Sequence, residues 1–90
     1  MDVRWDPAKD KANFRKHGVR FLDAESVLFD PFALSMEDTS AGGEQRFVSV
    51  GRDAMGDVVV LVYTYRGDEI RVISARPGTR TEIRMYEEGI

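Results

Sequence analysis

The chain has 90 residues, 42% of them hydrophobic and only 3 of them proline, which is enough for one folded domain spanning residues 1–90 and too little for two. It contains no cysteine, no apolar run of transmembrane length and no leader after Met1, so disulfides, zinc–thiolate sites and a membrane partner are excluded, and we expect a soluble cytoplasmic protein. The net charge of -3 argues against a nucleic-acid partner unless the basic residues are gathered in one place.

The N-terminal residues predict a short strand followed by a helix. The weak alternation from Asp2 to Trp5 is typical of a strand. Asp6 and Pro7 supply an N-cap and a proline at the first helical position, so we expect a helix to begin there. It ends at His17-Gly18, where glycine takes the left-handed C-cap conformation. Its apolar stripe is thin and consists of Ala8, Ala12 and Phe14.

A second amphipathic helix is predicted before Pro31. Apolar residues recur at three- and four-residue spacing at Phe21, Ala24, Val27 and Leu28. Asp30-Pro31 closes this helix, because the residue before a proline is disfavoured in the helical conformation. The two short helices therefore form an antiparallel or angled pair.

The rest of the chain predicts a sheet and a last helix. Strand-like runs cover residues 32–38, 44–52, 58–66 and 69–76, with polar loop and turn residues between them. Thr79 and Glu82 form a capping box, which starts a final helix with Ile83 and Tyr86 facing inward. The order of a short N-terminal strand, two helices, three or four antiparallel strands and a C-terminal helix predicts an α+β fold. Its helices cover one sheet face and leave the other available.

The hairpin formed by residues 58–76 assigns its side chains to definite faces. A two-residue turn at Gly67-Asp68 makes residues opposite each other share a face. One face is core-like and carries Leu61, Tyr63, Tyr65, Ile70 and Val72. The other face is polar and carries Thr64, Arg66 and Arg71. A turn one residue longer would move Arg71 to the opposite face.

The preceding strand extends this polar face. Pairing residues 44–52 with residues 58–66 puts Arg46 opposite Thr64 and Glu44 opposite Arg66. Arginines and a carboxylate then gather at one end of the face, which favours the binding of anions. The alternative is that these are ordinary solvent-facing arginines on the edge of a small sheet.

Charges are segregated along the chain. Residues 1–20 carry six Lys/Arg against three Asp, residues 21–44 carry six acids and no base, and residues 45–90 carry seven of each. This pattern favours one surface for phosphates and another, acidic surface for a basic partner. The alternative is that Asp23, Glu25 and Asp30 simply form the solvated face of the second helix.

Residues suited to acid–base chemistry or metal binding are few. His17 is the only histidine, and at the end of a helix it is either a general acid or base or a helix-terminal cap. The acids lack the spacing of a Ca²⁺ loop, so no metal and no cofactor are expected. The serines lack a nucleophile-elbow motif, which argues against nucleophilic catalysis.

Arginines beside a carboxylate suit one reaction, the cleavage of RNA by its own 2′-hydroxyl. That reaction needs a base for the hydroxyl proton, cations around the phosphorane and an acid for the leaving 5′-oxygen, and it requires no metal. The planar fork of arginine stays charged and contacts two phosphate oxygens at once. Glu44 or His17 is the expected base.

Several segments together resemble the BrnT toxins of bacterial type II toxin-antitoxin modules. They are WDPAKDKANFRKHGV, FLDAESVLFDP, EQRFVSVGR and VYTYRGDEIRVISAR, in this order between Trp5 and Tyr86. The resemblance implies a RelE-like α+β fold and an endoribonuclease that cuts RNA and lowers translation. It also implies a BrnA-like antitoxin that binds the toxin in a hetero-oligomer, blocks it and supplies the DNA binding.

The resemblance further implies roles for individual residues. Catalytic roles fall on His17, Glu44, Arg46, Arg66, Arg71 and Arg76, and phosphate-binding roles on Lys16 and Arg52. If residues alternate regularly along the strand, Arg76 lies on the face opposite the other arginines. It then either ties the last strand to the final helix or is turned by a bulge. Two features depart from the family pattern, namely Pro77-Gly78 after ISAR and the acidic net charge.

Two other functions remain open on the sequence. In the first, the chain is a module that binds RNA, the ribosome or only the antitoxin and does not cut RNA. In the second, the chain is an interaction subunit whose exposed sheet face is buried against a partner. RNA binding without cleavage products or growth arrest would select the first. Toxicity that survives alanine at His17 and Glu44 would select the second.

Overall fold

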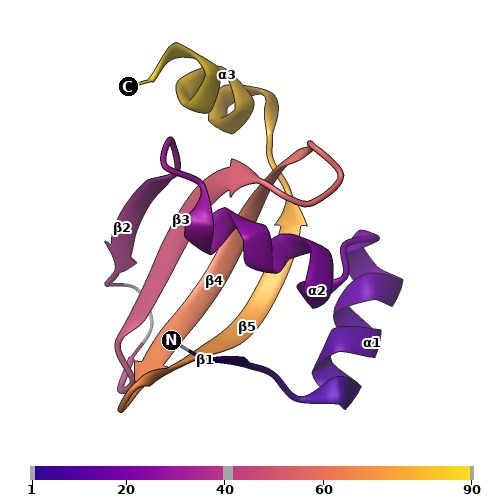
Figure 1. The fold of residues 1–90 in the computed structure, drawn as a ribbon, viewed down its shortest axis with the longest axis vertical. Helices are drawn as coiled ribbons and strands as arrows, with labels where there is room; N and C mark the ends of the chain where they lie inside the picture. Colours follow the sequence, from indigo (N-terminus) through magenta and orange to yellow (C-terminus); the bar gives the residue numbers. More distant parts are fainter. Residues whose placement is uncertain (1, 40–41, 90) are drawn as a thin grey trace.

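A mixed sheet with the strand order β1-β5-β4-β3-β2 organises the computed structural model, which describes residues 2–39 and 42–89 (Figure 1). The strands are β1 (Asp2–Arg4), β2 (Leu34–Asp38), β3 (Arg46–Arg52), β4 (Val58–Arg66) and β5 (Glu69–Pro77). Strands β2 to β5 pair antiparallel, and β1 pairs parallel with β5. The sheet has five strands rather than the three or four predicted, because the N-terminal strand joins it beside β5.

Helix α1 (Pro7–His17) has the predicted caps but a different buried side. The Asp6 carboxylate accepts a hydrogen bond from the Ala8 N–H, and Gly18 closes the helix with φ 74°. The predicted apolar stripe is wrong, because Ala8 and Ala12 are exposed, Phe14 is 43% exposed, and the buried residue of the helix is Asn13.

The Asn13 side chain joins α1 to β5. Its Nδ2 donates to the carbonyls of Val19 at 2.9 Å and Ala75 at 2.8 Å, and its Oδ1 accepts from the Ala75 N–H at 3.1 Å. Strand β1 pairs only with residues 69–71 of β5, so the amide serves the backbone of β5 beyond the end of β1. A polar residue is buried here because it satisfies backbone groups that would otherwise lack partners.

The second predicted helix is divided into two parts. An α-helical turn, α2 (Phe21–Ala24), continues as a 3-10 turn, η1 (Glu25–Phe29). The predicted apolar face is nevertheless confirmed, since Phe21, Ala24 and Val27 are buried in the core. Helix α3 (Arg80–Glu88) starts at the predicted capping box and buries Tyr86.

The core lies between one sheet face and the segment formed by α2 and η1, which crosses in front of the sheet in Figure 1, whereas α1 stands beside β5. We call this side the helix-covered face. It contributes Val59, Leu61, Tyr63, Ile70, Val72 and Ala75 to the core. Trp5 packs edge-on against Phe21 with ring centroids 6.1 Å apart. The predicted core-like side of the hairpin is therefore confirmed for Leu61, Tyr63, Ile70 and Val72, but it is wrong for Tyr65, which is 48% exposed near the β4–β5 turn.

The opposite side of the sheet, which we call the open face, is covered only at one end. There, Glu82 and Met85 of α3 line a small hollow with Leu34, Met36, Val48 and Val50 of the sheet. The end nearer the Gly67 turn lies away from α3, as Figure 1 shows. Within residues 2–39 and 42–89, no helix is long and apolar enough to cross a membrane.

The register of the hairpin holds near its turn and then shifts. Thr64 lies opposite Arg71, as predicted. A bulge next to Val62 and Tyr63 then displaces the remaining pairs by one residue, which places Arg76 opposite Val60. Arg76 therefore lies on the open face rather than on the face that simple alternation predicted.

Candidate functional site

Arginines from three strands form a line across the open face. Arg71 on β5 lies opposite Thr64 on one side and beside Arg4 of β1 on the other. Arg46 begins β3, opposite Asp38 of β2 and one residue beyond the last β3–β4 pair. We call Arg4, Arg46 and Arg71 the arginine row. The row combines segments distant in sequence on one side of the sheet.

The arginine row lies close against the sheet. Thr64 is only 2% exposed although it faces the open side, and its hydroxyl donates to the Gln45 carbonyl. The Nε atoms of Arg46 and Arg71 are buried and have no hydrogen-bond partner in the described structure. A buried donor without a partner costs about 1–3 kcal/mol, so these two guanidinium groups are held against the sheet at an energetic cost.

Carboxylates flank the arginine row on the side of the hairpin turn. Arg66 donates to Glu44 at 3.1 Å, as the predicted pairing requires. Arg4 lies 3.9 Å from Glu69 and 3.8 Å from Asp2. All of these side chains are at least 42% exposed, so each pair contributes roughly 0–1 kcal/mol and leaves its arginine available to a competing phosphate.

Arg4 is a candidate that sequence reasoning missed. The segment from Asp2 to Trp5 was predicted to be a strand, but its partner in the sheet was not identified. A short turn determines the pairing partner only of the two strands that it joins, whereas β1 pairs parallel with a strand more than 60 residues away. The alternation of Val3 with its charged neighbours was the only signal available.

His17 and Lys16 do not join the arginine row. They end α1 on the helix-covered side, and His17 lines a hollow with Asp23, Asp57 and Pro77. Pro77 lies opposite Val59, five residues along β4 from Thr64. At roughly 3.3 Å per residue this separates the two places by about 16 Å along the sheet. The structure therefore does not bring His17 near Glu44.

Arg52 is also remote from the arginine row. It lies opposite Val58 at the other end of the open face. Its guanidinium donates to the Gly56 carbonyl at 2.7 Å, lies over the Tyr86 ring and is 3.9 Å from Glu87. These contacts tie the β3–β4 turn to α3.

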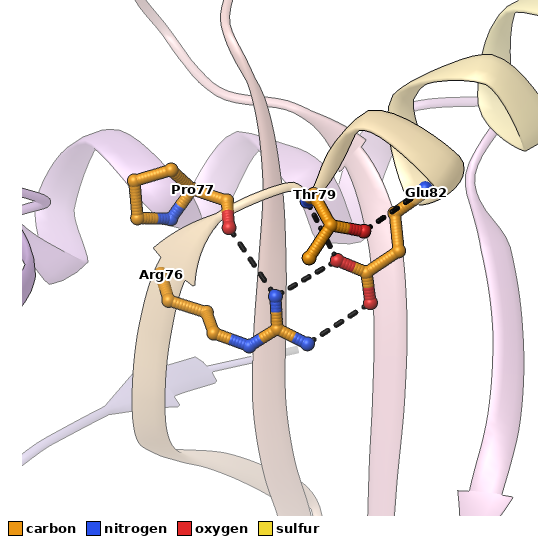
Figure 2. Close-up of polar contacts among 4 residues, drawn as sticks. All are labelled: Arg76, Pro77, Thr79 and Glu82. Carbon is orange, nitrogen blue, oxygen red and sulfur yellow. Dashed lines mark hydrogen bonds and ion pairs between the residues drawn. The ribbon is translucent and has the colours of Figure 1, made fainter.

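Arg76 connects the last strand to the last helix, as Figure 2 shows. Its two terminal nitrogens donate to the two carboxylate oxygens of Glu82 at 2.8 and 2.9 Å, and one of them also reaches the Pro77 carbonyl. Glu82 accepts in addition from the Thr79 N–H of the capping box. The alternatives left open by the sequence both hold, because a bulge turns Arg76 and Arg76 ties β5 to α3.

This pair predicts a weakening of the fold in acid. Hydrogen bonds from Arg76 lower the pKa of Glu82 from 4.5 to about 2. A carboxylate whose pKa is lower in the folded chain stabilises it above pH 4.5, and that contribution falls as the pH drops toward 2. Because Arg76 is partly exposed, we expect a loss of about 1–2 kcal/mol after screening.

The measurement is urea unfolding between pH 6 and pH 2. In Glu82→Gln the decline of the unfolding free energy between pH 4.5 and 2 should be shallower than in the unaltered chain, because the titrating group is gone. Glu88→Gln, on the exposed last turn of the same helix, is the matched control and should keep the original slope. Equal slopes in all three proteins would contradict this assignment.

Asp30 is a structural residue rather than part of a solvated acidic face. Its carboxylate accepts from the Tyr86 hydroxyl and from the N–H groups of Phe32 and Arg52. Burial opposes ionisation, but these hydrogen bonds hold the pKa of Asp30 below its ordinary value. The alternative that Asp23, Glu25 and Asp30 simply form the solvated face of the second helix is therefore wrong for Asp30. In the described parts of the chain, no group of three acidic or histidine side chains is placed to hold a metal.

Comparison with known proteins identifies a matching family model and a similar fold. The family model for the ribonuclease toxin BrnT of type II toxin-antitoxin systems matches residues 5–82. The crystal structure of the Brucella abortus ribonuclease toxin BrnT superposes with a TM-score of 0.70 and 24% sequence identity, over 89% of this chain and 99% of that chain. At this identity the likeness establishes the fold alone. No curated protein matches.

Proposed function

This chain belongs to the BrnT family of ribonuclease toxins of type II toxin-antitoxin systems, and on that premise we propose that it is an endoribonuclease that cuts cellular RNA without a metal ion and thereby inhibits translation. The cytoplasm is the compartment in which it would meet its substrate. The observation that carries this proposal is the arginine row on the open face, beside the exposed ion pair between Arg66 and the carboxylate of Glu44.

The reaction follows from the charges of this site. The 2′-hydroxyl attacks the adjacent phosphorus, a 2′,3′-cyclic phosphate forms, and the bond from phosphorus to the 5′-oxygen breaks. Arg46, Arg66 and Arg71 would stabilise the additional negative charge of the phosphorane. Glu44 would take the hydroxyl proton, and water at this exposed site would protonate the leaving oxygen. Arg4 joins these residues as a phosphate contact.

The other predicted site residues have supporting roles in this proposal. His17 and Lys16 lie at the far end of the helix-covered side, so Glu44 is the proposed base in place of His17. Arg76 would position the strand that carries Arg71 through its contact with Glu82. Arg52 would contact phosphates only of a longer RNA that extends toward α3.

The direct test is cleavage in the presence of a chelator. We expect the purified chain, freed of antitoxin, to cut a mixed RNA in excess EDTA and to leave cyclic phosphate ends. Catalase or another inert protein purified by the same steps is the control for contaminating nuclease. Cleavage that stops in EDTA and returns with Mg²⁺ would contradict the metal-independent mechanism.

A non-catalytic role is the second candidate. The observation that favours it is the separation of the only histidine from the arginine row, which leaves the row with no imidazole for proton transfer. In that case the row binds RNA through phosphates, and expression of the chain slows growth only by occupying RNA. Binding that yields no products over many hours would select this role.

We also propose that an antitoxin of the BrnA kind docks a basic segment on the acidic part of the chain. Glu25 and Glu37 belong to the acidic residues 21–44, and Glu37 is exposed on β2, whereas Asp30 is engaged in internal hydrogen bonds. Complementary charges of this kind mainly accelerate association.

Charge reversal tests that surface. Glu25→Lys with Glu37→Lys should slow association with the antitoxin of the same module by about tenfold at low salt, and by much less at high salt. Asp68→Lys with Glu88→Lys changes the net charge equally and serves as the control. An association rate that is unaltered at low salt would exclude the acidic surface as the docking site.

A further inference from the structure

A hollow on the helix-covered face has no part in the proposed reaction. It has a volume of about 360 Å³ and lies between η1 and the sheet. Its apolar walls include Val27, Leu28 and Ile70. This volume falls within the range of about 300–1,000 Å³ that small-molecule sites occupy, and it is large enough for one planar ring system.

A chain of hydroxyl groups crosses the floor of this hollow. The Ser35 Oγ on β2 is 2.7 Å from the Ser49 Oγ on β3, which is 2.8 Å from the Tyr63 hydroxyl on β4. All three residues line the hollow. Ser49 and Tyr63 are buried, so the chain is a built feature of the sheet rather than a set of solvated side chains.

The hydroxyl chain keeps free hydrogen-bonding capacity. Each hydroxyl donates once and accepts twice, and the two bonds between the three groups use two donors and two acceptor positions. Acceptor positions on these hydroxyls therefore remain for a ligand, whereas the Tyr63 hydroxyl also has the Tyr65 hydroxyl as a partner. A hydroxyl that rotates can match either a donor or an acceptor on the edge of that ligand.

The hollow is suited to an uncharged ligand. Among the residues that the structure describes, no Lys, Arg or His lines it. Its one acid, Asp30, already accepts three hydrogen bonds from other parts of the chain. A phosphate would find no cation here, whereas a neutral group with an apolar face and a polar edge finds partners for both.

Two aromatic side chains stand at the rim. Phe29 is 69% exposed and Tyr65 is 48% exposed, although both belong to elements that pack on the core. Exposed rings of this kind are platforms on which nucleobases stack. Tyr65 is itself held edge-on by Phe47, with centroids 5.2 Å apart, so its ring is positioned rather than free.

The hollow reaches the β1 edge of the sheet, where Arg4 of the arginine row lies, and it extends across the sheet to Ser35 on β2. Val3 lines the hollow, and the next residue, Arg4, belongs to the arginine row. Tyr65 likewise lies between Thr64 and Arg66, which point to the open face. A strand that rests its phosphates on the arginines and passes over the edge at β1 would bring a neighbouring base to the hollow.

We propose that this hollow binds one nucleobase of the RNA strand, with the hydroxyl chain of Ser35, Ser49 and Tyr63 reading its edge and Tyr65 stacking on its face. The inference rests on the proposed ribonuclease function for the identity of the ligand. It adds a determinant of base preference that lies on the opposite side of the sheet from the phosphate contacts.

Titration with the four uncharged nucleosides tests the hollow without requiring cleavage. We expect at least one of them to shift the amide resonances of Ser35 and Tyr65 with a dissociation constant in the millimolar range. Tyr65→Ala should weaken that binding by about tenfold, because a stacking platform is lost. Arg84→Ala, on the exposed side of α3, is the control and should bind as the unaltered chain does.

Mapping of cut sites is the second measurement. Ser35→Ala should reduce the preference for the favoured base by about tenfold, with circular dichroism confirming the fold. Nucleoside binding without any RNA cleavage would leave the hollow assigned and reject the ribonuclease proposal. The proposal for the hollow would be overturned if the chain cut RNA but bound no nucleoside, and if Ser35→Ala cut at the same sites as the unaltered chain. The proposal for the hollow would also be overturned if the antitoxin shifted the resonances of the residues that line it and no nucleoside did.

Discussion

Arg71→Ala is expected to reduce RNA cleavage by about 10²–10³-fold while the chain stays folded, since removing one preorganised donor to a developing oxyanion has an effect of this size. Arg71 occupies the centre of the arginine row, with Thr64 on one side and Arg4 on the other. Its Nε–H is buried without a partner, so its loss leaves no broken internal hydrogen bond at that atom. The measurement is the initial rate of cleavage of a defined RNA in EDTA.

Two further variants make this result specific. Arg71→Lys keeps the charge but not the planar fork, so we expect it to recover only part of the lost rate. Arg84→Ala removes one positive charge from the exposed surface of α3 and should retain the full rate. Full activity of Arg71→Ala would exclude the arginine row as the place where RNA is cut.

Asn13→Ala is expected to destabilise the chain by about 3 kcal/mol or more, because the carbonyls of Val19 and Ala75 and the Ala75 N–H all lose their partner in a buried place. For a chain of this size such a loss lowers the melting temperature by roughly 12–24 °C. Thermal and urea unfolding would measure the effect.

Comparison with neighbouring substitutions separates this contact from general damage to α1. Lys11→Ala, on the exposed side of the same helix, should change stability by about 0.5 kcal/mol or less. Asn13→Asp keeps an acceptor for the Ala75 N–H but turns an anion toward two carbonyls, so it should be at least as unstable as Asn13→Ala. A melting temperature for Asn13→Ala within a few degrees of the unaltered chain would refute the assignment.

Local signals in the sequence predicted the element boundaries well. Asp6 with Pro7, Gly18, and Thr79 with Glu82 act within one helical turn, and the structure uses each of them as predicted. The same holds for the β4–β5 hairpin near Gly67, where a short turn leaves little freedom of register. The pairing of Glu44 with Arg66 is likewise present.

The sequence by itself thus determined the α+β class, the caps, the face of each strand near the turn and the grouping of Arg46, Arg66 and Arg71. Tertiary structure alone decided that Arg4 lies beside Arg71, that a bulge turns Arg76 toward Glu82, and that Asn13 rather than Phe14 is the buried residue of α1. Caps and tight turns depend on neighbours a few residues away, which the sequence displays directly. Parallel pairing, bulges and buried amides depend on backbone groups far along the chain, whose positions exist only after the sheet has formed.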